Sequence, residues 1–125
     1  MNEDPAMNPK TCLYCRPSSA PNPWRDLTPR AADAVMAHVR IIDVRQPDEF
    51  HGEGQLPGAE LVPLGSLGAA MRDWDRAEPL LLVCRSGKRS GLACDALVSA
   101  GFASVHNLDG GMLAWREDER CRRPS

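Results

Sequence analysis

The sequence predicts a small α/β domain with a largely parallel central sheet and helices on both faces. Two short apolar runs, Ile-Ile-Asp-Val at residues 41–44 and Leu-Leu-Leu-Val at residues 80–83, indicate strands that are covered on both sides. Helical patterns separate these runs, and such alternation is typical of α/β folds with parallel strands. The chain has 125 residues, which is the length of about one domain.

The N-terminal part divides into an arm and the start of the domain. Residues 1–23 hold five prolines and no periodic apolar face, so we expect an extended or disordered arm. Residues 24–27 read as a short edge strand. Thr28 then offers a helix N-cap, and Pro29 suits the first helical position. The predicted helix has one apolar face with helical spacing, formed by Ala32, Val35, Met36 and Val39.

The middle of the chain holds the first predicted inner strand and several short elements. After the strand at 41–44, residues 47–50 begin with Pro and carry two acidic residues, which favours a short helix. Pro57 and Gly58 predict a turn, and residues 60–62 predict a further short strand. One face of the next predicted helix is formed by Leu64, Leu67, Met71 and Trp74.

The C-terminal part repeats the pattern of strand and helix. A helix is expected after residue 89, with Gly101 ending it. Residues 104–106 predict the last strand, and a final helix is expected after Gly111. The domain is thus expected to span 24–120, followed by a basic tail at 121–125. The apolar side of the helix after residue 89 is expected to be Leu92, Ala93, Ala96, Leu97 and Ala100.

Composition and charge exclude several classes of protein. The net charge of −2 gives no reason to expect a nucleic-acid or membrane partner. No run approaches the roughly eighteen apolar residues that a membrane span needs, and the first twenty residues lack the apolar core of a secretory signal. Five cysteines, an odd number, favour free thiols over a disulfide framework. We therefore expect a cytoplasmic protein.

The segment that follows the strand at 80–83 carries the chemistry. Cys84 is followed by Arg85, Ser86, Gly87, Lys88 and Arg89, and then by the predicted helix. Ligands of open α/β sheets bind at the carboxyl ends of the strands. Backbone amides of a tight loop can bind an anion, and the N-terminus of the helix adds positive potential.

This loop predicts a reactive thiol at Cys84. Neighbouring cations and a helix N-terminus lower the pKa of a cysteine, so Cys84 is expected to be largely thiolate at neutral pH. Such a thiolate can attack the outer sulfur of an anionic donor, and the amides would stabilise the resulting persulfide. The alternative is an inert buried cysteine, because free cysteines are often buried. Three cations within one short loop favour the reactive thiol.

Four segments together resemble the rhodanese family. Val-Cys-Arg-Ser-Gly-Lys-Arg-Ser at 83–90 is similar to the family's active-site loop. Ile-Ile-Asp-Val-Arg-Gln-Pro-Asp-Glu-Phe at 41–50 resembles its first signature, and Leu-Pro-Gly-Ala at 56–59 resembles its turn. Asn-Leu-Asp-Gly-Gly-Met-Leu-Ala-Trp at 107–115 resembles its C-terminal signature. The four occur in the family's order.

The resemblance implies a fold, an activity and a site. The fold would be a five-stranded, mainly parallel sheet. The activity would be transfer of a sulfane sulfur from thiosulfate or a similar donor to cyanide or a thiol, through a persulfide on Cys84. Residues 85–89 would form the binding loop, and Asp43 and Arg45 would support it. No metal or organic cofactor would be required. The partners would be small sulfur donors and acceptors, and a protein acceptor remains open.

Two other functions share this loop. Related phosphatases and arsenate reductases carry an arginine six positions after the cysteine, whereas here the sixth position is Ser90 and Arg89 is the fifth. The loop is therefore one residue short for that chemistry. The second alternative is a persulfide carrier or interaction module that serves a protein partner, and the sequence leaves it open.

The remaining cysteines are weaker candidates. Cys12 and Cys15 form a pair in the arm, and such a pair can act in redox or sulfur relay or bind metal. A structural zinc site normally needs four ligands, and no second pair exists, so a tail without a defined role is favoured. Cys94 lies in the predicted helix after the loop and is expected to be a packed or partly exposed thiol rather than a resolving partner for Cys84.

Overall fold

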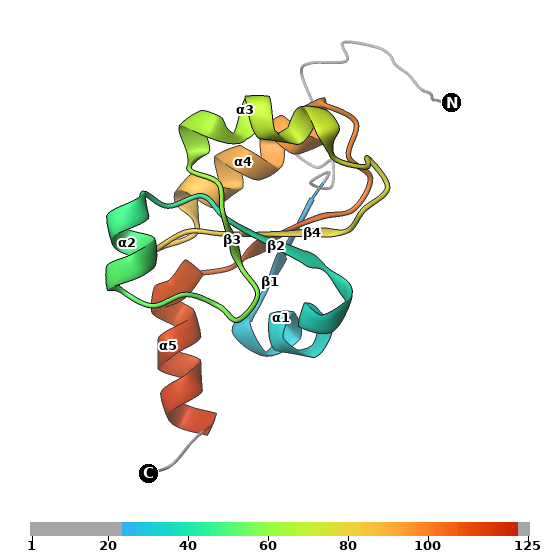
Figure 1. The fold of residues 1–125 in the computed structure, drawn as a ribbon. Coiled ribbons are helices and arrows are strands. Elements are labelled where there is room, and N and C mark those ends of the chain that lie inside the picture. The colour runs from blue at the N-terminus through green and yellow to red at the C-terminus, as the bar shows by residue number, and fades with distance from the viewer. Residues whose placement is uncertain (1–23, 123–125) are drawn as a thin grey trace.

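The computed structural model describes residues 24–122, with side chains as far as residue 119, and shows five strands in one sheet (Figure 1). The strand order is β1-β5-β4-β2-β3, and every neighbouring pair is parallel. The α/β class is thus confirmed, and the sheet is wholly rather than largely parallel. The strands are β1 (Arg25–Leu27), β2 (Arg40–Asp43), β3 (Glu60–Leu61), β4 (Leu80–Val83) and β5 (Val105–Leu108).

The two apolar runs form the middle of the sheet, as predicted. Every residue of β4 is buried, and in β2 only Arg40 is partly exposed. The two strands pair with Ile42 opposite Leu82 and Asp43 opposite Val83. Side chains of a strand point alternately to the two faces, so an apolar run without alternation fits a strand covered on both sides.

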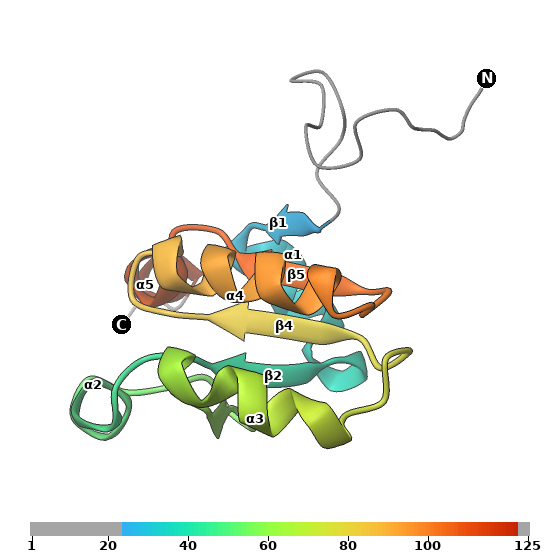
Figure 2. The ribbon, with the colours of Figure 1, turned by 90° about the horizontal axis from the view of Figure 1, so that it is seen from above.

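Helices cover the two faces of the sheet in separate layers (Figures 1 and 2). α3 (Leu67–Ala70) and α4 (Lys88–Ser99) lie on one face, and α1 (Pro29–Val35) and α5 (Gly111–Arg122) lie on the other. The short α2 (Pro47–Gly52) lies beyond one end of the strands. The hydroxyl of Thr28 caps α1 by accepting a hydrogen bond of 3.2 Å from the amide of Ala31, as the sequence predicted.

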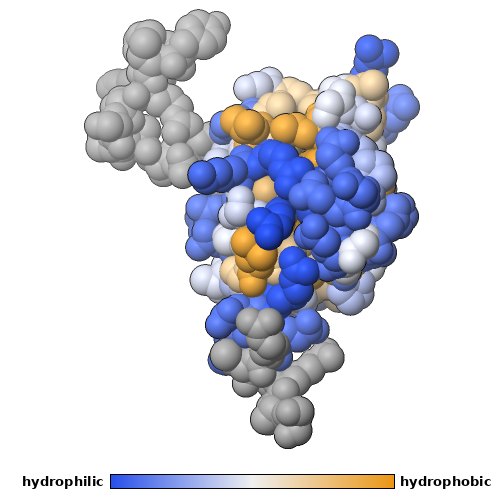
Figure 3. All heavy atoms as spheres, turned by 90° about the vertical axis from the view of Figure 1, so that its left-hand side faces the viewer, coloured by the Kyte–Doolittle hydropathy of each residue, from blue (hydrophilic) through white to orange (hydrophobic). Residues whose placement is uncertain are grey.

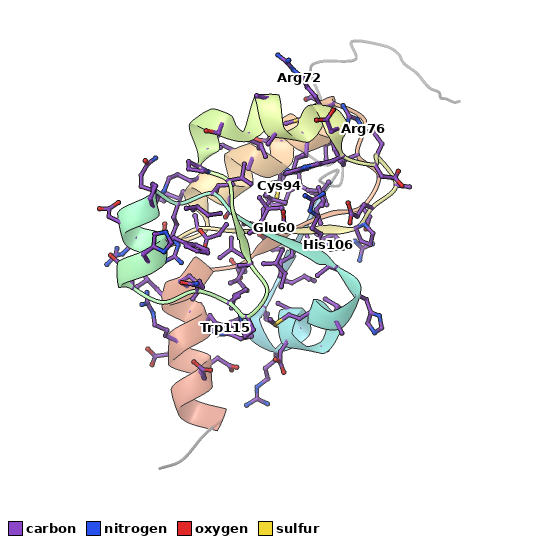
Figure 4. The ribbon with its side chains drawn as sticks, in the orientation of Figure 1. Glu60, Arg72, Arg76, Cys94, His106 and Trp115 are labelled. Atoms are coloured by element: carbon purple, nitrogen blue, oxygen red, sulfur yellow. The ribbon has the colours of Figure 1, made fainter. Side chains whose placement is uncertain are left out.

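Each face of the sheet has its own hydrophobic core. The core under α4 takes alternate residues of β2 and β4, such as Ile42 and Leu82, and the core under α1 and α5 takes the others, such as Ile41 and Leu81. This division follows from the two-residue period of a strand. Trp115 joins the second core from α5 and lies between α5 and α1 (Figure 4).

The buried face of α4 differs from the predicted one. Leu92 is 62% exposed and Ala96 is exposed, whereas Ser90, Ala93, Cys94 and Leu97 are buried. The prediction grouped apolar residues alone, but the loop before α4 fixes the rotation of the helix. That rotation turns the polar Ser90 inward, toward the end of β4.

Two further elements differ from the predicted ones. Residues 64–74 do not form one helix: 3₁₀ turns at Leu64–Ser66 and Met71–Asp73 flank the single α-helical turn of α3. Gly65 and Gly68 lie in this segment, and glycine disfavours a continuous helix. The last strand also begins and ends later than expected, because Asn107 and Leu108 continue the pairing.

Candidate active site

The candidate site lies where β2 and β4 end. Both strands point the same way in Figure 2, toward the edge where α2 and the start of α5 lie. Cys84 follows the last residue of β4 and is fully buried. The predicted position at the carboxyl end of the sheet is therefore the observed one, and ligands of open parallel sheets bind at such edges.

Two hydrogen bonds from the start of α5 fix the backbone at Cys84 and Arg85. The amide of Met112 donates to the Cys84 carbonyl at 2.9 Å, and the amide of Leu113 donates to the Arg85 carbonyl at 3.1 Å. Because both carbonyls face α5, the following amides are free to point toward the thiol. Gly111 makes this approach possible, since a Cβ there would overlap the carbonyl oxygens of Cys84 and Arg85.

The sulfur of Cys84 receives hydrogen bonds from the loop and from α4. The amide of Gly87 donates to Sγ at 3.0 Å, and the hydroxyl of Ser90 donates at 3.3 Å. Burial acts to raise the pKa of Cys84, but the Ser90 hydroxyl and the amides of Ser90, Gly87 and Ser86 outweigh it and lower the pKa. The thiolate is thus favoured by hydrogen bonds to the charged form, and this geometry fits a nucleophile.

Gly87 sits at a position that strongly favours glycine. Its φ is +98°, and a Cβ would lie 3.3 Å from the amide nitrogen of Gly110. The side-chain amide of Asn107, in β5, donates to the Gly87 carbonyl at 3.2 Å and to Asp26 in β1 at 3.0 Å. The turn of the loop is therefore tied to the neighbouring strand of the sheet.

Arg89 is paired with a carboxylate from α2. Its two terminal nitrogens each donate to one oxygen of Glu49 at 2.7 Å. The pairing holds the pKa of Glu49 at about 2, well below its usual range, mainly through the Arg89 hydrogen bonds. The sequence alone suggested that Arg89 would be an unpaired cation at the site. In the structure it is paired with Glu49. The neighbouring carboxylate neutralises much of its charge.

The other loop residues are more open to solvent. Arg85 is exposed, and its Nε lies 3.7 Å from a carboxylate oxygen of Glu53, just after α2. Ser86 and Lys88 are exposed as well. Among the residues that the structure describes, Lys88 is the loop cation with no ion pair. Positive potential at the site is accordingly smaller than three unpaired cations would give.

Asp43 and Arg45 form a buried ion pair beside the site. Both side chains are fully buried, and the Arg45 guanidinium donates to the carboxylate at 2.8–3.1 Å. Arg45 also donates to the carbonyl of Gly54 at 2.7 Å, so it joins the end of β2 to the chain that follows α2. The pair lies under the site and does not contact Cys84 by any hydrogen bond among the described residues.

Within the described residues, neither Asp109 nor Cys94 donates a hydrogen bond to the Cys84 sulfur. Asp109, in the C-terminal signature, is exposed. Cys94 is buried, and its Sγ donates to the His106 carbonyl at 3.6 Å on the α4 side of the sheet (Figure 4). Burial raises the pKa of Cys94 strongly, which fits the predicted packing role. The pair Cys12 and Cys15 lies outside the described residues.

The face around the site is mixed in character. Figure 3 shows the side of the molecule where α2 and the start of α5 lie, with strongly hydrophilic side chains over most of the surface and smaller hydrophobic areas among them.

Over the described part of the chain, no group of three or more His, Cys, Asp or Glu side chains is placed to hold a metal ion. No helix within that part is long and apolar enough to cross a membrane.

Three contributors to the site were missed by sequence reasoning. The sequence analysis used Ser90 only to measure the length of the loop after Cys84. It included Glu49 and Asn107 only as members of the family signatures and predicted no contact for them. A polar residue one turn into the helix after the cysteine is a usable signal for Ser90. The contacts of Asn107 and Glu49 join segments about 20 and 40 residues apart in the chain, and spacing does not reveal such contacts.

A rhodanese-like domain model matches residues 28–118, which include the loop, the buried ion pair and the start of α5. The chain belongs to the rhodanese-like domain family. It is 35% identical over 89 residues to a sulfurtransferase of Allochromatium vinosum, covering 71% of this chain and 80% of that protein. It is also 34% identical over 95 residues to the thiosulfate sulfurtransferase GlpE of Pseudomonas entomophila, covering 76% and 82%. These relatives support sulfur transfer as the general activity of this rhodanese.

Solved structures agree on the fold. The protein RPA3614 of Rhodopseudomonas palustris superimposes with a TM-score of 0.71 at 26% identity, covering 77% of this chain and 82% of that one. RPA3614 is described as a protein of unknown function and possible tyrosine phosphatase. The likeness therefore places this rhodanese among proteins that share an architecture, while the choice of chemistry depends on the loop.

Proposed function

We propose that this rhodanese-like protein moves a sulfane sulfur from thiosulfate or a similar donor to a thiophilic acceptor through a persulfide on Cys84. One observation carries the proposal: the Cys84 sulfur lies at the end of β4 and accepts hydrogen bonds from the Gly87 amide and the Ser90 hydroxyl. Donors aimed at a sulfur favour its anionic form, which is the nucleophile in this chemistry.

The reaction proceeds in two displacements at sulfur. The Cys84 thiolate attacks the outer sulfur of thiosulfate, the S–S bond of the donor breaks, and its electron pair leaves with sulfite. The outer sulfur is now bonded to Cys84 as a persulfide. Cyanide or a thiolate then attacks that sulfur, forms thiocyanate or a new persulfide, and returns the electron pair to Cys84. Sulfur is transferred without a net external oxidant.

The loop supplies the binding groups for this sequence. Residues 85–89 curve around the thiol, and amides that stabilise the thiolate also suit the terminal sulfur of the persulfide. Lys88 is the cation best placed to attract the donor, because Arg85 and Arg89 already face carboxylates. Asp43 and Arg45 support the loop from below. The proposed chemistry uses no metal or organic cofactor.

The test is turnover of thiosulfate with cyanide in variants of the buried cysteines. Cys84→Ser should remove the activity and leave the fold intact, because serine is a similar but far weaker nucleophile. Cys94→Ala is the matched control and should keep most of the activity, since the Cys94 side chain packs between α4 and the sheet and donates to the His106 carbonyl rather than to the Cys84 sulfur. Activity above about a tenth of the parent in Cys84→Ser would show that another thiol carries the sulfur.

A phosphatase assay addresses the related chemistry. The observed loop supports sulfur transfer over phosphate transfer, because Arg89 is the fifth residue after the cysteine and is held by Glu49. The expected result is no hydrolysis of an aryl phosphate. Hydrolysis that depends on Cys84, together with no sulfur transfer, would contradict the proposal.

We also propose the domain bounds, the cellular location and the partners of the protein. Residues 24–120 would form the catalytic domain, flanked by residues 1–23 and 121–125. We propose a cytoplasmic location, because the odd number of cysteines fits a reducing compartment. Small sulfur donors and acceptors would be the partners, and a protein thiol is a further acceptor that the same persulfide would serve.

A further inference from the structure

The entrance to the site combines cations with carboxylates. Arg85 lies in the loop, Lys88 and Arg89 begin α4, and Glu49 and Glu53 face two of these three cations. The Glu49 pair is the closer one: two hydrogen bonds of 2.7 Å join it to Arg89, whereas the Glu53 contact is a single approach of 3.7 Å. Both partners of the Glu49 pair are largely shielded from solvent, since the side chains are 18% and 34% exposed.

The Glu49 carboxylate is fixed in its place by contacts that do not involve Arg89. It accepts a hydrogen bond of 3.0 Å from the amide of Gln46 and so closes the capping box of α2. The chain after α2 is held by Arg45, which donates to the Gly54 carbonyl at 2.7 Å, and by Arg116, which donates to the Glu53 carbonyl at 2.7 Å. The carboxylate therefore stays beside the loop when a donor arrives.

We propose that Glu49 is a specificity-determining residue that makes the site discriminate among sulfur donors by their negative charge. The inference rests on the proposed function and adds to it. A carboxylate bound to Arg89 cancels much of the attraction that this guanidinium would exert on an anion. It also repels the anion directly. A dianion such as thiosulfate is penalised more than a donor with one charge or none.

Arg89 keeps a role in this arrangement. A guanidinium has five N–H groups, and the bidentate pair uses two of them. Three N–H groups of Arg89 thus remain outside the Glu49 pair. Glu49 thus holds Arg89 in one orientation and reduces its net charge, and removing the charge of Glu49 separates the two effects.

Alkylation of Cys84 measures this discrimination without any sulfur transfer. The ratio of the rate with anionic iodoacetate to the rate with neutral iodoacetamide, each mapped to Cys84 by peptide mass, reports the local potential. Both rates depend on the same thiolate fraction, so the ratio is independent of the pKa of Cys84. In Glu49→Gln the ratio should rise about threefold or more at low ionic strength and move back toward the parent value with added salt.

Two further variants separate charge from geometry. Glu49→Asp keeps the charge and should stay near the parent ratio. Glu60→Gln removes a carboxylate from a similar two-point pair with Arg40, which lies at the opposite end of β2, and should leave the ratio unchanged (Figure 4). An unchanged ratio in Glu49→Gln, or an equal rise in either other variant, would overturn the inference.

Sulfur-transfer kinetics give the second readout. Glu49→Gln should lower the KM for thiosulfate several-fold and lower by a smaller factor the KM for an organic thiosulfonate, which carries one negative charge and gives up its outer sulfur with loss of a sulfinate. A parent protein that accepts no sulfur from either donor would contradict the proposed function, and the alkylation ratio would still decide the role of Glu49. Equal changes of KM for both donors would contradict discrimination by charge.

Discussion

At the scale of single residues, hydrogen bonds rather than cations account for the lowered pKa of Cys84. The cationic loop suggested that Arg85, Lys88 and Arg89 would lower the pKa of Cys84. In the structure two of these cations face carboxylates, and the groups that lower the pKa are the Ser90 hydroxyl and three backbone amides. Those amides and the Ser90 hydroxyl come from the turn of the loop and the first turn of α4.

Replacing Ser90 with alanine should raise the pKa of Cys84, because the hydroxyl donates to the sulfur and favours its charged form. Alkylation of Cys84 by iodoacetamide at pH 7 should slow several-fold and recover as the pH is raised. Ser86→Ala is the control: its exposed side chain is lost, but its amide remains. A pH profile of alkylation that is identical in Ser90→Ala and the parent would contradict this assignment.

The Glu49–Arg89 pair should contribute to stability over a defined range of pH. The pKa of Glu49 is about 2 in the folded protein against an ordinary 4.5, so the native state favours the charged carboxylate. The contribution is fully present above about 4.5 and is lost as the pH falls toward 2. The difference in unfolding free energy between the parent and Glu49→Gln should shrink across that range. A difference that stays constant down to pH 2 would contradict it.

At the scale of elements, the start of α5 shapes the loop of the candidate active site. Its first amides bind the carbonyls of Cys84 and Arg85, and the bare backbone of Gly111 lets the two segments meet. The two glycines of the C-terminal signature are therefore explained by close contacts. A Cβ on Gly111, the first residue of α5, would overlap the loop backbone, and a Cβ on Gly110 would overlap the side chain of Ala114.

Gly111→Ala should disrupt the loop more than it disrupts the sheet. The φ of +61° and the overlap with two carbonyl oxygens should cost about 1–3 kcal/mol of stability and most of the sulfur-transfer activity. Gly68→Ala, in α3, meets no atom within 4 Å and should be neutral or slightly stabilising. Thermal unfolding and turnover of both variants give the measurement. A fully active Gly111→Ala would show that the contact does not shape the site.

The buried Asp43–Arg45 ion pair, which joins the end of β2 to the chain after α2, should also contribute to the stability of the fold. Arg45→Met leaves the carboxylate of Asp43 buried without its guanidinium partner, which typically costs about 3–5 kcal/mol. The free energy of unfolding in denaturant measures the loss. The double variant Asp43→Asn with Arg45→Met should recover part of it, and a single variant as stable as the parent would contradict the role of the pair.

At the scale of the whole molecule, the sequence predicted what depends on local pattern. The buried runs of β2 and β4, the cap at Thr28 and the position of Cys84 were all readable, because strand burial, capping and motif order are local properties. The sequence did not predict which face of α4 is buried. The buried face depends on the loop that precedes the helix, and the inward position of Ser90 became visible only with the fold.

Contacts between distant segments account for the rest. Glu49 meets Arg89 across 40 positions, and Asn107 meets Gly87 across 20. These pairs come together because β2, β4 and β5 lie side by side with their carboxyl ends at one edge. A single sequence gives no signal for such partners. The charge at the site was therefore overestimated from the loop alone.

The most direct test of the central claim is the intact mass of the reduced protein after incubation with thiosulfate, followed by a cyanide chase. We expect a gain of one sulfur, about 32 Da, that maps to Cys84, disappears with cyanide and is absent in Cys84→Ser. A folded, reduced protein that gains no sulfur, or gains it at another cysteine, would contradict a persulfide on Cys84.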